Sequence, residues 1–439
     1  MLIITNKITH RIKFIFELIF SDMLNVDVDF TTNIDDFNSY QGAKISYGVG
    51  STNSNCYFYA SSLLFEKHIS PKLLDFGTYK NEPIFFCTSD ENSLLPFDIF
   101  AASFYLVSRY EEYLPFEADA HDRFPAEESV ALKNNFLHKP LVNIWVEWLR
   151  NILNEKFQSL NIRKIPFRYL PTIDVDSAFK YKHKGFIRNL GGIYSDLKNN
   201  SFSVFLKKLA ERKDVILNKL PDPFNTFDVC IDLHKDFDKY PFYFILLADF
   251  SKNNPNISYS SWSFRNVIQQ LSDYGNVGIH PSYQTFDNKN LMLEEINRLQ
   301  DIISTKINSS RQHFLRFRLP ETYHILIDNN ITNDYSMGYS QHVGYRASIA
   351  YPFYFFDLSR DYKTNLMIHP FAVMDGALKP FVKTNESVNI VKQLVDELYE
   401  VGGVFTTVWH NHALTSDEDG TDWLNIYKEI LNYLKQKQQ

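Results

Sequence analysis

Two aspartates, Asp174 and Asp176, are separated by a single residue directly after a mostly apolar run at residues 165–173. The run is typical of a β-strand, in which side chains alternate between faces, so both carboxylates would leave one face at the strand's end. Two such carboxylates repel each other unless a cation or a proton lies between them. The spacing indicates either a divalent metal held beside a general base, or a polar strand end at which Asp176 caps the next helix.

Other groups capable of catalysis or metal binding stand at comparable places later in the chain. From about residue 164 onward, strand-like runs alternate with helical runs, which is typical of an α/β fold with parallel strands. In such folds the reactive residues collect at the carboxyl ends of the strands, where the loops converge. Six residues of this kind follow the expected strands: Asp174, Asp176, His280, Arg318, Asp334 and His410. A lone histidine after a strand is more often structural, but the recurrence favours one shared site.

The sequence predicts two domains. Residues 1–164 are expected to form an N-terminal α/β accessory domain, and residues 165–439 a second α/β domain that carries the site. Apolar periodicity in the first domain predicts helices at 6–24, 96–114 and 140–157 and strands at 43–48 and 82–87. Arg109 lies close to Glu111 and Glu112 in the sequence, and we interpret these three residues as a solvated or capping charge cluster.

Composition restricts the possible partners. The chain has 45 lysines and arginines against 52 aspartates and glutamates, and its net charge of -7 disfavours nucleic acids and anionic membranes. Its three scattered cysteines fit a reducing cytoplasm. The apolar stretch at 14–20 is interrupted by Glu17, and no window approaches the roughly 20 apolar residues of a membrane span. We therefore expect a cytoplasmic protein with no membrane span and no nucleic-acid partner.

The order of the motifs resembles the polysaccharide deacetylase family, the metal-dependent carbohydrate esterases with the NodB homology domain, in the two-domain form found in Bacteroidota. The family's Thr-aromatic-Asp-Asp strand end is similar to residues 172–176 (Thr-Ile-Asp-Val-Asp), with one residue inserted. Its His-x-x-x-His motif after a glycine-containing strand is similar to residues 278–284 (Gly-Ile-His-Pro-Ser-Tyr-Gln). Its Arg-x-Pro motif matches residues 318–320 (Arg-Leu-Pro), and its late strand-end histidine matches His410.

The resemblance implies a fold and a metal. Residues 165–439 would form the distorted (β/α) barrel of the family, beside the N-terminal α/β module. Asp176 and His280 would hold a divalent ion, zinc or another ion such as cobalt. The family's second metal histidine falls on Gln284, whose neutral oxygen is a weaker ligand.

The sequence leaves the third protein ligand of the metal open. Ser282, His183 or an extra water could replace the missing histidine, or nothing could. An alternative alignment places His280 on the family's second histidine and leaves Asn276 at the first.

The resemblance also implies the catalytic roles. Asp174 would be the general base, and Arg318 would orient it and balance its charge. His410 would be the general acid that protonates the leaving amine, with Asp334 as a candidate partner. One of the two histidines in the run Trp-His-Asn-His at residues 409–412 would be functional and the other structural.

Three residues beside these motifs are predicted to contact the substrate: Tyr283, Glu321 and Trp409. Glu321 stands where the family has an aromatic residue after the proline, so this chain departs from the family's contact to the substrate oxygen.

The resulting hypothesis is a metal-dependent hydrolase that removes N-acetyl (or O-acetyl) groups from an amino-sugar glycan or its precursor. An acetamide is a poor electrophile, so the reaction needs a Lewis acid, a base for the attacking water and an acid for the leaving nitrogen. One alternative is a catalytically inactive relative that binds glycan or serves as a scaffold. Another is an Asp-x-Asp glycosyltransferase, which is disfavoured because no glycine-rich phosphate loop precedes Asp174.

Overall fold

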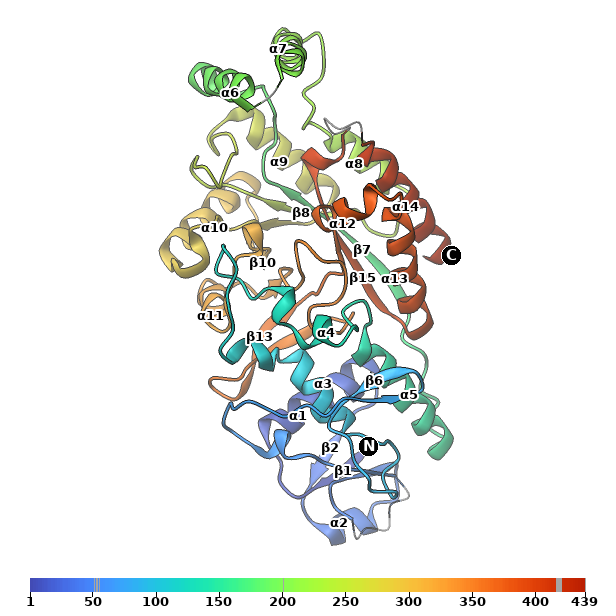
Figure 1. The fold of residues 1–439 in the computed structure, drawn as a ribbon. Coiled ribbons are helices and arrows are strands. Elements are labelled where there is room, and N and C mark those ends of the chain that lie inside the picture. The colour runs from blue at the N-terminus through green and yellow to red at the C-terminus, as the bar shows by residue number, and fades with distance from the viewer. Residues whose placement is uncertain (51, 53, 55, 200, 416–420, 439) are drawn as a thin grey trace.

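The structure is a computed structural model that describes residues 1–50, 52, 54, 56–199, 201–415 and 421–438. Within these ranges the strands form a four-stranded sheet, a nine-stranded sheet and a two-stranded hairpin. The four-stranded sheet lies near the N-terminus at one end of an elongated molecule, and the nine-stranded sheet fills its middle (Figure 1).

The small sheet has the strand order β2-β1-β3-β4 with parallel neighbours throughout. Its apolar face is covered by aromatic rings, among which Phe16 stacks on Phe100 with 4.0 Å between the ring centroids. The elements of this part are β1 (Leu2–Thr5), α1 (His10–Phe16), the π-helix η1 (Glu17–Met23), β2 (Asp29–Thr31), α2 (Ile34–Ser39), β3 (Lys44–Tyr47), β4 (Tyr57–Phe58), η2 (Ser62–Phe65), β5 (Gly77–Tyr79), β6 (Glu82–Ile84), α3 (Ile99–Val107), η3 (Tyr110–Tyr113), η4 (Ala126–Glu128), α4 (Val130–Lys133) and α5 (Leu141–Lys156). The predicted helices and strands of this part are confirmed, with shorter bounds.

The large sheet has the order β12-β13-β11-β10-β9-β8-β7-β15-β14. Its neighbours are parallel except for the antiparallel pair β12 and β13. The strands are β7 (Phe167–Val175), β8 (Phe242–Ile245), β9 (Val277–Ile279), β10 (Ser309–Ser310), β11 (Asn333–Asp334), β12 (Phe353–Asp357), β13 (Tyr362–Ile368), β14 (Val373–Met374) and β15 (Gly403–His410). The α/β class with a large parallel sheet is therefore confirmed. No pairing joins β12 to β14 in the described residues, so closure into a barrel stays a prediction.

Helices cover the large sheet on both sides (Figure 1). α13 and α14 pack against β7 near β15, whereas α10 packs against β9. The helices are α6 (Gly185–Asn199), α7 (Phe202–Ile216), α8 (Phe227–His234), α9 (Trp262–Tyr274), α10 (Lys289–Ile303), α11 (Glu321–Asp328), α12 (Asp375–Val382), α13 (Ser387–Val401) and α14 (Trp423–Gln438), with short 3-10 turns η5 (Thr285–Asp287), η6 (His313–Leu315) and η7 (Asn411–Ala413). Among the described residues, no helix combines the length and the apolar character needed to cross a membrane.

The two long central strands position the candidate site. β7 pairs with β15 along most of its length, which places His410 opposite Asp174. On its other side β7 pairs with β8, which places Phe244 opposite Asp174. Because these strands are parallel, their carboxyl ends lie at the same edge of the sheet. The loops after β7, β9, β10, β14 and β15 therefore start close together.

A buried ion-pair network joins the N-terminal part to the large sheet. The Glu112 carboxylate lies 2.7 Å from Arg109 Nε and 2.7 Å from Arg346 Nη2, and all three side chains are buried. Arg109 also donates a hydrogen bond to the Arg346 carbonyl. The interpretation of a solvated cluster is wrong, because Arg346 from the loop after β11 covers these charges. The alternative of a capping residue holds for Glu111, whose Oε2 accepts the backbone N–H of Val130 at the start of α4 at 2.8 Å. Since one hydrophobic core contains residues from both predicted domains, the boundary after residue 164 stays a prediction.

Candidate active site

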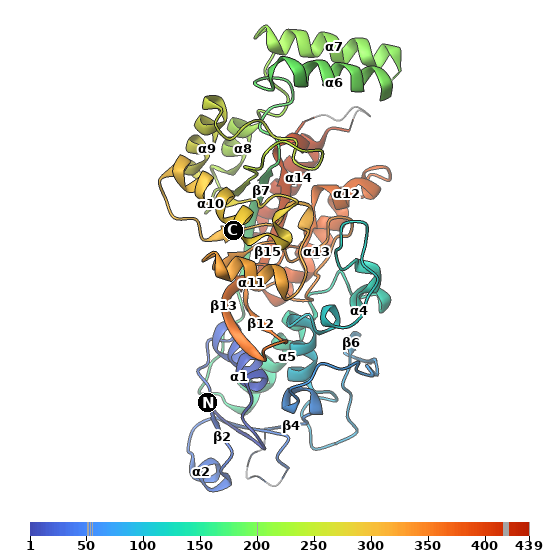
Figure 2. The ribbon, with the colours of Figure 1, turned by 90° about the vertical axis from the view of Figure 1, so that its left-hand side faces the viewer.

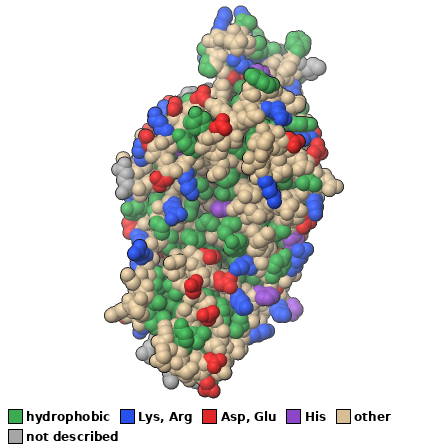
Figure 3. All heavy atoms as spheres, turned by 180° about the vertical axis from the view of Figure 1, so that it is seen from behind, with side chains coloured by type: hydrophobic (Ala, Val, Ile, Leu, Met, Phe, Trp, Pro, Cys, Tyr) green, Lys and Arg blue, Asp and Glu red, His purple; other side chains and the backbone are tan. Residues whose placement is uncertain are grey.

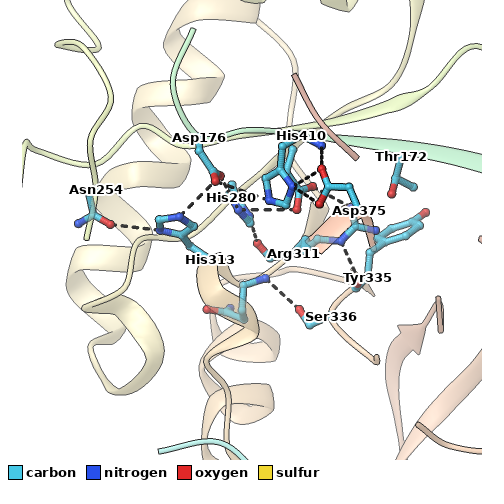
Figure 4. A network of polar contacts seen from close by, with 12 residues as sticks. Thr172, Asp176, Asn254, His280, Arg311, His313, Tyr335, Ser336, Asp375 and His410 are labelled. Atoms are coloured by element: carbon cyan, nitrogen blue, oxygen red, sulfur yellow. Dashed lines mark hydrogen bonds and ion pairs between the residues drawn. The ribbon is translucent and has the colours of Figure 1, made fainter. Parts of the chain in front are cut away.

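A cavity of about 410 Å³ opens where the carboxyl ends of the central strands converge. Its wall includes side chains from the carboxyl ends of five strands of the large sheet and from the residues that follow them: Asp174 in β7 and Asp176 after it, His280 after β9, His313 after β10, Asp375 after β14 and His410 at the end of β15. His121 and Arg123 of the N-terminal part complete the wall. The structure thus brings four of the residues predicted from sequence into one cavity. Asp176, His280 and His410 are labelled in Figure 4.

Three of these side chains form a group that can hold a metal ion. One ligand atom each from Asp176, His280 and His313 lie within 4.8 Å of one another. Asp176 Oδ1 is 3.2 Å from His280 Nε2 and 3.6 Å from His313 Nε2. This oxygen is buried, and neither contact has the geometry of a hydrogen bond. A buried carboxylate oxygen without a hydrogen-bond donor fits a cation between the three groups.

The outer nitrogens of both histidines are held by oxygen atoms. His280 Nδ1 lies 2.5 Å from the Arg311 carbonyl, and His313 Nδ1 lies 3.3 Å from Asn254 Oδ1. A neutral imidazole that donates from Nδ1 turns its Nε2 lone pair inward, which is the usual arrangement of histidine ligands in metal sites. An Asp-His-His set of this kind suits zinc, which binds imidazole nitrogen and carboxylate oxygen and keeps an open position in catalytic sites.

The protonation states also fit a cation. Burial alone would raise the pKa of Asp176, but the electrostatic effect of His313 and His410 and the close contacts with His280 and His313 hold that pKa well below its usual value. Burial lowers the pKa of His313, against the opposing charge of Asp176. An ionised carboxylate beside a neutral imidazole is the form in which both groups bind a metal.

Gln284, the predicted third metal ligand, lies outside this group. Its Oε1 accepts a hydrogen bond of 2.7 Å from Asn254 Nδ2, and the Asn254 Oδ1 then faces His313. Gln284 therefore contacts Asn254, which in turn faces His313, and His313 is the third member of the group that could hold a metal ion. The other candidates are also elsewhere: the His183 ring is exposed near Ser263, and the Ser282 amide donates to Glu295.

Asp174 is paired with an arginine that the sequence did not single out. Arg311 Nη1 lies 2.7 Å from Asp174 Oδ1, and neither side chain is accessible to solvent beyond 1%. Arg311 Nε donates to the Tyr335 carbonyl at 2.9 Å, which fixes the guanidinium (Figure 4). Arg318, the predicted partner, has an exposed side chain just before α11. It follows the turn η6, and among the described residues no ion pair joins it to the buried Asp174, so the prediction that it contacts Asp174 is wrong.

His410 is held by Asp375, which follows the neighbouring strand β14. Its Nδ1 lies 2.9 Å from Asp375 Oδ1, and its backbone N–H donates to Asp375 Oδ2 at 2.9 Å. The His410 Nε2 lies 3.6 Å from Asp176 Oδ2. Burial opposes protonation of His410, but the charges of Asp375 and Asp176 outweigh it and raise its pKa to about 10.

Asp334, the predicted partner of His410, does not reach it. Asp334 is the last residue of β11, and its carboxylate is buried. It accepts hydrogen bonds from Ser310 Oγ at 3.0 Å, Ser336 Oγ at 2.9 Å and the Tyr323 hydroxyl at 3.1 Å. These three donors explain its burial without a charged partner. The contact of His410 with Asp334 is therefore corrected to a contact with Asp375.

The predicted substrate contacts are largely elsewhere. The Trp409 side chain is fully buried and packs on Tyr427, with 4.5 Å between ring centroids, because it leaves the face of β15 opposite to His410. Glu321 is exposed at the first position of α11. The Tyr283 hydroxyl lies 3.1 Å from Nδ1 of His121, which does line the cavity. Only Tyr283 is therefore close to the cavity wall, and its contact with a substrate stays a prediction.

Three site residues that the sequence did not reveal, Arg311, His313 and Asp375, share one property. Arg311 and His313 follow β10, and Asp375 follows β14, and each strand is two residues long. Such short strands carry no alternation of apolar residues, so the sequence gives no sign that a strand ends there. The available signal was the run Arg-Gln-His at residues 311–313 after a long amphipathic helix.

Comparison with known proteins gives one family match. The model of a family of unknown function, DUF7033, matches residues 1–158. A search of curated proteins finds no match at the threshold used for significance.

Solved structures show distant likenesses. A candidate polysaccharide deacetylase from Mycobacterium smegmatis has a TM-score of 0.38 and 10% identity, over 62% of this chain and 84% of that one. A polysaccharide deacetylase from Bacillus cereus has a TM-score of 0.31 and 11% identity, over 63% of this chain and 89% of that one. Puue allantoinase has a TM-score of 0.38 and 12% identity, over 62% and 84%. With TM-scores this low, the function has to be argued from the geometry of the site.

Proposed function

We propose that this protein is a metal-dependent hydrolase that removes N-acetyl groups, or alternatively O-acetyl groups, from an amino-sugar glycan or its precursor. One observation carries the proposal. A candidate metal group, a carboxylate paired with arginine and a histidine paired with a carboxylate all line the same cavity. These are the three parts that amide hydrolysis at neutral pH requires.

Asp176, His280 and His313 would hold the ion, which we propose to be zinc, with cobalt as a substitute. When bound, it would supply a Lewis acid for the acyl oxygen and the attacking water. The protein prepares this site by turning the lone pairs of both imidazoles inward through Asn254 and the Arg311 carbonyl.

Asp174 is the proposed general base. Arg311 binds its Oδ1 at 2.7 Å, while its Oδ2 lies 3.8 Å from His280 Nε2, on the side of the candidate ligands. The second oxygen is thus the one directed to where a water would be deprotonated as it attacks the acyl carbon. The ion pair keeps the carboxylate in this orientation as the proton is transferred.

His410 is the proposed general acid. Asp375 holds the ring through Nδ1 and leaves Nε2 directed into the cavity, toward Asp176. Because its pKa is raised to about 10, His410 carries a proton at neutral pH that it can give to the leaving nitrogen. His410 and Asp174 are register partners on the neighbouring strands β15 and β7, so the proposed acid and base lie at the ends of adjacent strands.

The two other candidate functions are less well supported. A glycosyltransferase would use both carboxylates of the Asp-x-Asp pair at its metal, but Asp174 is already bound to Arg311. An inactive glycan-binding relative would have no need for the buried His410–Asp375 pair beside the cavity. We propose the cytoplasm as the location, since all three cysteines are free thiols, as expected in a reducing compartment.

The test combines metal analysis with an acetate-release assay on N-acetylglucosamine oligomers. The purified chain should contain one divalent ion per molecule and release acetate, and both should be lost in His280→Ala. The matched control is His68→Ala, which removes an exposed histidine of the N-terminal part. If the chain holds no ion and zinc does not raise its melting temperature, the binding-protein alternative takes the place of the hydrolase.

A further inference from the structure

A pair of helices, α6 and α7, projects from the body of the molecule directly after β7 (Figure 2). α6 ends at Asn199 and α7 begins at Phe202, so the short link makes the two helices antiparallel neighbours. They pack on each other through Arg212, whose Nη2 lies 2.7 Å from Asp196 Oδ2. We call residues 185–216 the helical hairpin.

The helical hairpin exposes large apolar side chains at helical spacing. Phe186 is 77% exposed, Tyr194 is 68% exposed and Phe202 is 69% exposed. The exposed apolar residues are Phe186, Leu190, Tyr194 and Leu197 on α6, and Phe202, Leu206, Leu209 and Ile216 on α7. On each helix these positions recur every three or four residues or by multiples of that step, so they form a single stripe. Contiguous exposed apolar surface of this kind marks a binding surface in proteins.

The two stripes lie on the same side of the helical hairpin. On α6 the stripe is about a quarter turn from Asn189 and Asp196, which contact Arg212 of α7. On α7 the stripe is about a quarter turn, in the same rotational sense, from Lys208 and Arg212, which contact Asp196. Because the two helices are antiparallel, an equal rotation from the contact face to the stripe, in the same sense about each helix axis, places both stripes on the same side of the helix pair. The helical hairpin therefore presents its exposed apolar residues on one face, in which Lys213 lies between Leu209 and Ile216.

The charge of this region is opposite to that of the chain. Residues 180–220 contain ten lysines and arginines against three aspartates and glutamates, a net charge of +7, whereas the whole chain has -7. Lys198, Lys207 and Lys213 are exposed on the helices themselves. Basic and apolar side chains gather at this end of the molecule in the space-filling view (Figure 3).

We propose that the helical hairpin docks on the surface of an anionic lipid bilayer. An amphipathic helix with Phe and Leu on one face and Lys and Arg around it binds in the plane of the membrane interface. The apolar face enters the boundary between headgroups and acyl chains, and each lysine near the surface gains from the negative potential of the lipids. The proposal concerns binding only and is independent of the proposed hydrolysis.

Charge distinguishes this occupant from the alternatives. The helical hairpin itself has six lysines and arginines against three aspartates and glutamates, so two copies of the chain that met through it would bring together two segments of net charge +3, which repel each other. A nucleic acid would satisfy the lysines, but it offers nothing to the aliphatic residues Leu190, Leu197 and Leu206, which are also exposed. A lipid surface satisfies both the charge and the apolar face.

The base of the helical hairpin is fixed to the body beside the candidate site. The Arg188 guanidinium lies 3.8 Å from the Phe250 ring centroid and donates to the Asn256 carbonyl at 2.9 Å. The Asp222 carboxylate accepts backbone N–H bonds from Lys180 and Tyr181. The helical hairpin follows β7, the strand that carries Asp174, so docking would orient the cavity's end of the sheet toward the membrane.

The test is cosedimentation of the full chain with vesicles of phosphatidylcholine and phosphatidylglycerol in equal parts, beside vesicles of phosphatidylcholine alone. We expect binding to the anionic vesicles that falls as salt is raised. The apolar variant Leu190→Ser/Leu206→Ser and the charge variant Lys207→Gln/Lys213→Gln should each lower the partition coefficient, on the order of tenfold. Acetate release from a water-soluble substrate should not change in either variant.

The matched controls are Leu73→Ser and Lys67→Gln, which alter exposed residues of the N-terminal part and should bind as the wild type does. The proposal is overturned if the wild-type chain does not bind anionic vesicles at low salt. It is also overturned if binding is equal on both vesicles, or if the apolar variant removes a concentration-dependent dimer instead. The wild-type salt series decides the question even if a variant fails to fold.

Discussion

Arg311 and Asp174 form a buried ion pair, with 2.7 Å between Nη1 and Oδ1, at the carboxyl ends of two strands that are not neighbours in the sheet. The pair ties β10 to β7, which are separated by β9 and β8 in the sheet. Removal of one partner of a buried ion pair lowers the stability of a protein far more than replacement of both partners by apolar residues, because the remaining charge has no counterion.

Arg311→Met should therefore lower the free energy of unfolding by about 3–5 kcal/mol and abolish turnover. Arg318→Met is the matched control, since that side chain is exposed, and its effect on stability should stay within about 0.5 kcal/mol. Urea unfolding and acetate release measure the two quantities. Equal loss of activity in both variants would return the orienting role to Arg318.

His313→Ala should lose the bound metal, because it removes one of three ligands. Gln284→Ala should keep the metal at weaker affinity, about 10–100-fold, because Gln284 acts on His313 only through Asn254. Equilibrium dialysis with zinc measures both affinities. If Gln284→Ala releases the metal as fully as His313→Ala does, Gln284 is a direct ligand and the assignment of His313 fails.

Asp375→Asn should lower the pKa of His410, because it replaces the negative charge that lies 2.9 Å from Nδ1 by a neutral amide. A general acid works only while it is protonated, so the alkaline limit of activity should move to lower pH. NMR titration of the His410 ring and the pH–rate profile measure the two shifts. A profile unchanged from the wild type would exclude His410 as the acid. Asp334→Asn should leave the alkaline limit in place, since Asp334 does not contact His410.

Asp98 should make the N-terminal part less stable as the pH rises from about 4 to 6. Burial raises its pKa from 3.8 to about 6, against hydrogen bonds from Ala101, Ser61 and Tyr47. In this window the folded state binds a proton that the unfolded state has released, so the free energy of unfolding falls by up to about 3 kcal/mol.

Asp98→Asn keeps an oxygen for the N-cap of α3 and cannot ionise, so it should remove this part of the pH dependence. Urea unfolding at a series of pH values measures the difference between variant and wild type. Between pH 4 and 6 the free energy of unfolding of the variant should rise relative to that of the wild type. A constant difference would mean that Asp98 titrates alike in both states.

The sequence predicted best those parts of the fold that rest on long apolar runs. β7 and β15 are nine and eight residues long and mostly buried, so their ends, and with them Asp174, Asp176 and His410, could be located. Their partners could not, because β10 consists of Ser309 and Ser310 and is a strand only through its neighbours β9 and β11.

The net charge of the whole chain did not reveal the basic character of the helical hairpin. A net charge of -7 indicated that an anionic membrane is an unsuitable partner, because composition adds the basic helical hairpin to an acidic remainder. The fold separates the two, since the hairpin projects from the body (Figure 2). Local charge after folding, and not the sum over the sequence, decides which surface can meet a lipid.

The contact between Glu112 and Arg346 has a consequence for attempts to dissect this protein. The large sheet made alone would carry the Arg346 guanidinium in its interior with no counterion, and the N-terminal part made alone would leave Glu112 and Arg109 at a bare apolar surface. We therefore expect each fragment made alone to be less stable than the same part within the whole chain, and an exchange of N-terminal parts between relatives to require the matching arginine.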